Sequence, residues 1–128
     1  MSPSIFVSAP ALPETVEVDR RYREITGARG PLAGLAALYA YESQIPAVAE
    51  TKIDGLKTFY GIDEERALDF FQTHIEADEW HAQVARDLLA DATPNEQAAA
   101  LEAVEDALDA LNLLLDGVWN AYCAEAAA

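Results

Sequence analysis

The 128-residue sequence is poor in cysteine, in basic residues and in long apolar runs. Its one cysteine, Cys123, cannot form an internal disulfide, so we expect a reduced, cytoplasmic setting. Eight basic residues against 23 acidic ones give a net charge of -15, which argues against nucleic-acid and anionic membrane partners. No apolar run approaches the roughly 20 residues that span a bilayer, and the start lacks the basic region of a signal peptide.

Alanine and leucine are plentiful, and 52% of the residues are hydrophobic, as expected of a folded, helix-rich chain. Residues 1–12 are expected to form an irregular lead-in and residues 13–128 a single helical domain. Prolines at helix starts and glycines or capping residues at helix ends predict four helices, over 13–26, 31–60, 64–90 and 94–124. Short connections favour antiparallel neighbours, so the sequence predicts an all-α, four-helix antiparallel bundle.

The predicted helix over 31–60 contains a proline inside a strong helical pattern. Pro46 cannot bond to the carbonyl of Glu42, one turn earlier, so we expect a kink there rather than a helix end. Irregular helix next to a polar inward-facing residue is common at functional sites. The alternative is a bend that only follows the curvature of the core.

Polar residues interrupt the inward-facing line of the helix over 64–90. Steps of three and four residues place seven side chains on one face, as in a buried stripe. Four of them are small or apolar, and the middle three are His, Asp and His. A carboxylate between two imidazoles is costly in a core unless it serves as a ligand, and a divalent metal is the usual reason. We call this line the ligand seam: Ala67, Phe71, His74, Asp78, His81, Ala85 and Leu88.

Glu42 is the one charged residue on the inward-facing line of the preceding helix, and antiparallel packing can bring it opposite the ligand seam. With His74, Asp78 and His81 it makes two imidazoles and two carboxylates, which suit Fe, Mn or Zn, and open positions favour redox-active iron. The alternative is a buried hydrogen-bonded network without metal. Glu79, off the seam, is only a spare ligand.

A second line on the same helix runs along the flank of Glu42 through Tyr41, Ile45, Val48 and Lys52. A lysine near a metal pocket can act as a base, a substrate anchor or an amine donor. The alternative is a lysine at a helix edge whose ammonium group reaches solvent.

The last predicted helix is expected to be structural, because its inward-facing line carries no ligand-type residue. That line is Ala98, Leu101, Val104, Leu108, Leu111, Leu115, Val118 and Tyr122.

Three stretches of the chain resemble a known family. They are LPET at 12–15, LAALYAYESQIPAVAETKIDGLKTFYGI at 35–62 and FFQTHIEADEWH at 70–81. Together they resemble the C-terminal half of the CADD-like, folate-metabolism branch of the haem-oxygenase-like di-metal oxidases, which are more distantly similar to PqqC and TenA. The resemblance implies half of a haem-oxygenase-like helical domain.

The resemblance also implies roles for particular residues. Glu42, His74, Asp78 and His81 match metal-ligand positions, and Lys52 matches a lysine implicated in the chemistry. Tyr41, from the line that flanks Glu42, is the second candidate catalytic residue. It is not the family's product-supplying tyrosine, which belongs to the upstream half and has no counterpart in this sequence. The activity implied is an iron-dependent, oxygen-using oxidase of para-aminobenzoate and folate biosynthesis, in which a tyrosine and the lysine are thought to supply the product.

The chain also departs from the family. Its members are longer, and an upstream helix supplies a further Glu and His, whereas residues 1–12 contain neither a histidine nor a carboxylate. We therefore expect an incomplete or inactive member that holds one iron or manganese ion per chain, and two only with ligands from elsewhere. A homo-oligomer, or pairing with another helical segment, is expected. The alternative function is a non-catalytic interaction module that pairs through an exposed apolar face.

Overall fold

The computed structural model describes residues 10–124, and these form helices without a strand. Most of the predicted lead-in, residues 1–9, lies outside the described part, as do residues 125–128. The predicted all-α fold is confirmed. No helix in residues 10–124 is both long and apolar enough to cross a membrane. The helices are α2 (Pro13–Ala28), α3 (Pro31–Glu42), α4 (Ile45–Tyr60), α5 (Glu65–Ala90) and α6 (Pro94–Tyr122).

Local sequence signals set most of the helix ends. Prolines stand at the first or second positions of α2, α3, α4 and α6, where a missing N–H costs nothing. The sequence Thr93-Pro94-Asn95-Glu96 predicts a capping box, and it is present: the Glu96 carboxylate accepts from the Thr93 N–H at 2.8 Å, and the Thr93 hydroxyl accepts from the Glu96 N–H at 3.4 Å. Gly61 ends α4 in the left-handed conformation, with φ of 63°.

The kink expected at Pro46 is instead a break between two helices, so that prediction was wrong. Helix α3 ends at Glu42, Ser43 and Gln44 form a turn, and Pro46 lies in the first turn of α4. The proline cannot donate to the Glu42 carbonyl, and its fixed φ suits a helix start. The Gln44 amide donates to the Ala40 carbonyl at 3.3 Å, so side-chain bonding partly replaces the lost helical pattern.

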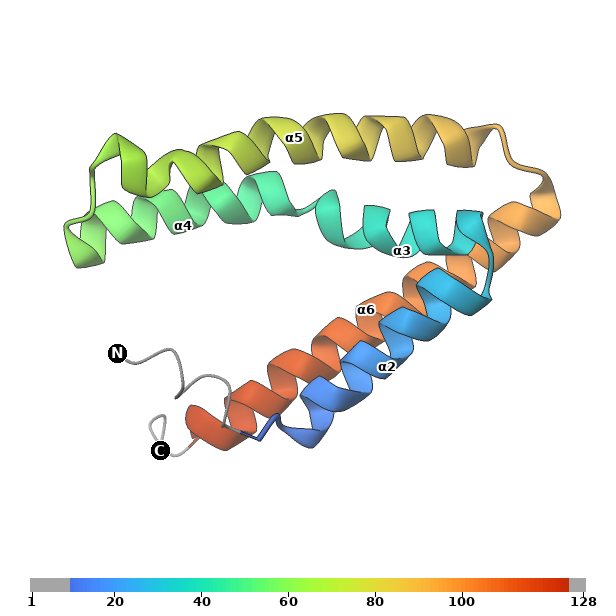
Figure 1. Ribbon diagram of the computed structural model, residues 1–128, viewed down its shortest axis with the longest axis horizontal. Coiled ribbons are helices and arrows are strands. Elements are labelled where there is room, and N and C mark those ends of the chain that lie inside the picture. Colours follow the sequence, from blue (N-terminus) through green and yellow to red (C-terminus); the bar gives the residue numbers. More distant parts are fainter. Residues whose placement is uncertain (1–9, 125–128) are drawn as a thin grey trace.

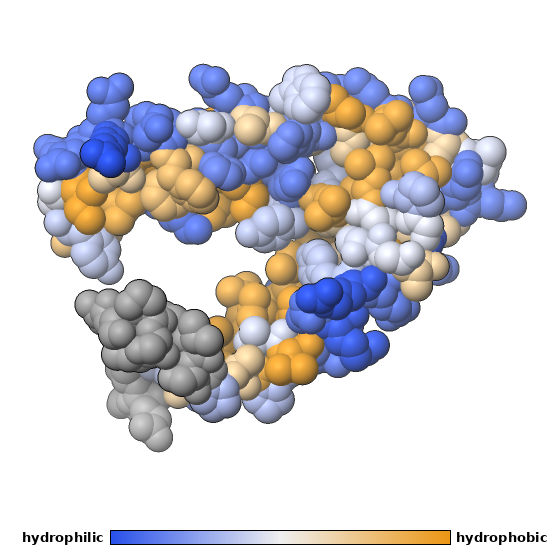
Figure 2. Space-filling view, in the orientation of Figure 1, coloured by the Kyte–Doolittle hydropathy of each residue, from blue (hydrophilic) through white to orange (hydrophobic). Residues whose placement is uncertain are grey.

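The helices form an open V (Figure 1). Helices α4 and α5 run antiparallel as one arm, and α2 and α6 run antiparallel as the other. Helix α3 joins the arms and contacts α2, α5 and α6. Figure 2 shows the hollow between the arms, with hydrophobic residues along both of its walls. The bundle is therefore open on one side.

The buried core consists mostly of alanine. Among the described residues, Ile25 and Leu68 are the only large side chains that are fully buried. The other buried apolar residues are Ala33, Ala36, Ala37, Ala49, Ala82, Ala85, Ala100, Ala103, Ala107 and Ala110. Helices that pack through such small residues lie close together, and their large side chains point away from these contacts.

Helix α6 shows this most clearly, and its predicted inward-facing line was wrong. Its buried face carries alanines, whereas Leu101 is 60% exposed, Leu115 65% and Tyr122 71%. The physical reason is the close approach of α2: a Cβ on Gly117 would lie 2.7 Å from the Glu14 Cβ. Only the small-residue face of α6 allows that approach, so the leucine face is turned outward.

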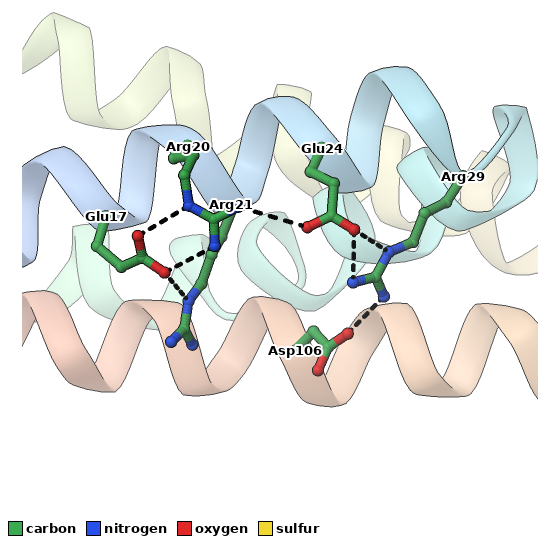
Figure 3. A network of polar contacts seen from close by, with 6 residues as sticks. All are labelled: Glu17, Arg20, Arg21, Glu24, Arg29 and Asp106. Atoms are coloured by element: carbon green, nitrogen blue, oxygen red, sulfur yellow. Dashed lines mark hydrogen bonds and ion pairs between the residues drawn. The ribbon is translucent and has the colours of Figure 1, made fainter.

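Ion pairs along α2 also tie that helix to α6 (Figure 3). Arg29 pairs with Glu24 at 3.1 Å within the α2 segment and with Asp106 on α6. Hydrogen bonds from Arg20 and, to a smaller extent, from Arg21 lower the pKa of Glu17 to about 2. The basic residues of α2 are thus committed to neighbouring carboxylates and do not form a free basic patch.

Candidate metal centre

Asp78 is the one buried charged residue in the described part of the chain. It lies in the middle of α5, and its side chain is only 10% exposed. No lysine or arginine in residues 10–124 forms an ion pair with it; the nearest group able to carry a positive charge is the imidazole of His81. A carboxylate buried in this way is costly without a counter-charge, so a bound cation would offset its charge.

Three of the four predicted ligands come together around this carboxylate. The His81 Nδ1 atom lies 3.5 Å from Glu42 Oε2 and 3.6 Å from Asp78 Oδ1. One ligand atom from each of the three residues lies within 4.8 Å of the others. Glu42 is the last residue of α3, so the helix break at Ser43 and Gln44 places it at the edge of α5.

The two distances from His81 Nδ1 fit a shared ion better than direct hydrogen bonds. Contacts of 3.5 and 3.6 Å between donor and acceptor are too long for a good hydrogen bond. Two ligands bound at about 2.1 Å to one ion stand about 3.0 to 4.2 Å apart for angles from 90° to 180°. Two carboxylates and an imidazole are also a donor set that Fe, Mn and Zn accept. The residues therefore fit the predicted metal.

His74 lies beside this cluster without belonging to its tightest part. It is half-buried on the same groove, one turn before Asp78, and its ring stands 4.1 Å from the Phe70 ring. Its Nδ1 atom lies 2.6 Å from the Phe70 carbonyl oxygen. Because a carbonyl only accepts, Nδ1 is the donor, and in the neutral imidazole the free lone pair is then on Nε2. That tautomer is the one in which Nε2 can bind a metal.

The candidate catalytic residues line the same groove, which has a volume of about 440 Å³. The Lys52 Nζ atom lies 5.9 Å from the centroid of the Phe71 ring, where the ring face attracts the ammonium group. Tyr41 lies at the groove wall and is 44% exposed. Glu79, the spare ligand, is exposed and does not line this groove.

Phe70 is the site residue that the sequence reasoning missed. Its carbonyl sets the tautomer of His74, and its ring covers the imidazole. It does not lie on the ligand seam and is largely exposed, so periodicity gave no reason to select it. The available signal was its position four residues before a candidate ligand, where its carbonyl can accept from that histidine.

The sequence profile of the haem-oxygenase-like family described as iron-containing redox enzymes matches residues 1–114. The chain belongs to this family. Its all-α fold and its carboxylate and imidazole cluster agree with that membership.

Several relatives of the chain are 4-aminobenzoate synthases. A 4-aminobenzoate synthase of Nitrosomonas europaea is 44% identical over 119 residues, which cover 91% of this chain and 48% of the relative. The 4-aminobenzoate synthases of Chlamydia muridarum and Chlamydia trachomatis are 39% and 38% identical over 84 residues, which cover 66% of this chain and 36% of each relative. The chain thus spans half or less of the length of these relatives.

Proposed function

We propose that this chain carries an iron site of a 4-aminobenzoate synthase-type oxidase and, as a single copy, holds at most one ion. The observation that carries the proposal is the convergence of Glu42, Asp78 and His81 on one point beside α5. Membership of an iron-containing redox family and the shared name of the relatives supply the reaction class.

In this proposal each ligand has a role set by its surroundings. Asp78 supplies the buried negative charge, and Glu42 and His81 close the site from the rim, where their side chains are 31% and 46% exposed. His74 offers Nε2 from within the groove, because Phe70 holds the proton on Nδ1. Bound iron, or manganese in its place, would supply one-electron chemistry with molecular oxygen.

Lys52 and Tyr41 are proposed as the catalytic residues. Lys52 reaches the groove wall from α4, and a neutral lysine amine is a competent nitrogen nucleophile. Tyr41 presents its phenol at the same groove, one residue before Glu42. Both side chains therefore line the same groove as the candidate ligands. A catalytic group must be held close to the reacting atoms in this way.

The number of ligands limits what one copy can do. Two carboxylates and two imidazoles are enough ligands to hold one ion with coordination positions left open. They are too few to hold two ions that also need open positions for oxygen. We therefore propose little oxygen-dependent turnover by the single chain unless another polypeptide adds ligands. The large exposed apolar side chains favour, as the second candidate function, an interaction module without catalysis.

Iron binding separates the two functions. The purified chain would be titrated with Fe(II) without oxygen, gel-filtered and analysed for metal, alongside Asp78→Ala. Retention of iron by the wild type and its loss in Asp78→Ala supports the metal-site proposal. Equal iron in both proteins would show that Asp78 is not a ligand and contradicts the proposed site, whereas no retained iron in the wild type favours the interaction module.

A further inference from the structure

The ammonium group of Lys52 lies against an aromatic ring and not against a carboxylate. The residues three and four positions away on α4 are apolar: Val48, Ala49, Gly55 and Leu56. Within residues 10–124 Lys52 forms no ion pair, although the chain has 23 acidic residues and 8 basic ones. Its Nζ atom stands 5.9 Å from the centroid of the Phe71 ring on α5, the helix that runs beside α4 (Figure 1).

The Phe71 ring is itself held by its neighbours on α5. The rings of Phe70 and Phe71 meet at 90°, with their centroids 5.4 Å apart, which is a favourable edge-to-face arrangement. Phe70 also packs against the imidazole of His74, at 4.1 Å between ring centroids. Lys52, Phe71, Phe70 and His74 therefore form a row along the groove, from the proposed catalytic lysine to a candidate metal ligand.

We propose that Phe71 is the positioning residue for Lys52: its ring keeps the ammonium group at the groove wall, beside the candidate ligands. This inference rests on the proposed function, because it explains how the proposed catalytic amine is kept in place. The lysine stem is flexible, and without an attractive contact its charged end extends into solvent. A catalytic amine must remain close to the reacting atoms.

The aromatic character of residue 71 is essential to this role. An aliphatic side chain could fill the same space, but it would not attract a charge. The face of a phenyl ring carries the negative part of its quadrupole, and at a partly exposed site the attraction corresponds to about two- to fivefold in population. Phe71 is the one phenylalanine of the ligand seam, and it is half-buried there.

The second lysine of the chain provides an internal reference. The sequence contains two lysines, Lys52 and Lys57. Lys57 is exposed in the last turn of α4, does not line the groove, and has no comparable ring contact within residues 10–124. Both side chains carry the same charge on the same helix. A difference between their signals therefore reports the contact with Phe71.

NMR of the metal-free chain, reductively methylated with carbon-13 formaldehyde, tests the proposal. Dimethylation keeps the charge of each lysine, and Lys57→Arg assigns the two methyl signals. We expect nuclear Overhauser contacts between the Lys52 methyl groups and the Phe71 ring, and an upfield ring-current shift relative to Lys57. Phe71→Leu should remove both effects, so that the two lysine signals become alike. Phe71→Tyr keeps a ring face and should retain them.

Phe59→Leu is the matched control, because Phe59 is 81% exposed on α4 and does not line the groove. It should leave the Lys52 signal unchanged, and circular dichroism checks that each variant stays helical. The absence of Lys52–Phe71 contacts in the wild type would overturn the proposal without recourse to any variant. An unchanged Lys52 signal in a helical Phe71→Leu protein would overturn it as well.

The result does not depend on the metal site, because the experiment contains no iron. A chain that retains iron in the titration described above but lacks the Lys52–Phe71 contact contradicts this inference alone. A chain that shows the contact but retains no iron contradicts the proposed function and leaves the placement of Lys52 established.

Discussion

The His81 Nδ1 atom on α5 lies 3.5 Å from Glu42 Oε2, and Glu42 directly precedes the break between α3 and α4. His81 is held by the long, continuous α5, whereas Glu42 is the last residue of α3. Their meeting therefore depends on where α3 stops, and hence on Ser43, Gln44 and Pro46. The geometry of the candidate metal centre therefore depends on the helix break.

Pro46→Ala should weaken metal binding. The new N–H can bond to the Glu42 carbonyl and let the helix continue, which moves the Glu42 carboxylate away from His81. We expect the affinity for Fe(II) to fall about tenfold or more, as it does when groups that orient ligands are lost. Anaerobic titration measures it. Pro94→Ala, at the start of α6, is the control and should keep wild-type affinity; a Pro46→Ala protein with unchanged affinity would contradict the link.

Gly117→Ala should destabilise the chain. Its Cβ would lie 2.7 Å from the Glu14 Cβ, so α2 and α6 must move apart. A cost of about 1 to 3 kcal/mol in the free energy of unfolding is expected for such overpacking. Gly55→Ala is the matched control, since its nearest heavy atom is 4.0 Å away and alanine favours a helix by about 0.5 to 1 kcal/mol. Urea denaturation of both variants measures the difference, and equal stability would refute the close approach.

Stability should depend on pH through Glu17. Its pKa is lowered from 4.5 to about 2 by hydrogen bonds from Arg20 and Arg21, so its contribution is present above pH 4.5 and is lost as the pH falls towards 2. Glu17→Gln should therefore lower the free energy of unfolding at neutral pH, by an amount that shrinks in acid. Glu102→Gln, on exposed α6 surface, should show no such change. A Glu17→Gln effect that is equal at pH 7 and pH 2.5 would be the contrary result.

The helix ends and the ligand cluster could be predicted from the sequence because both follow from local rules. Proline and capping residues act on the nearest turn, as at Thr93 and Glu96, and steps of three and four place Asp78 and His81 on one face. The proximity of Glu42 needed only the assumption that neighbouring helices pack antiparallel. Whether these residues bind metal remains a prediction.

The orientation of α6 could not be predicted in this way. Its leucines and its alanines both repeat at helical spacing, so periodicity identifies two apolar faces and does not say which is buried. The choice depends on how closely α2 approaches Gly117, which is a tertiary property. The break at Pro46 was missed for a similar reason, because a proline one turn inside a pattern is compatible with a kink or with a new helix start.

Metal analysis of the gel-filtered protein after titration with iron and with manganese tests the central claim most directly. We expect at most one ion per copy, weakly held, with binding abolished in His74→Ala and in Asp78→Ala. Glu79→Ala, whose carboxylate is exposed away from the groove, should bind as the wild type does. Two tightly held irons per single chain, or wild-type binding by Asp78→Ala, would show that other residues are the ligands.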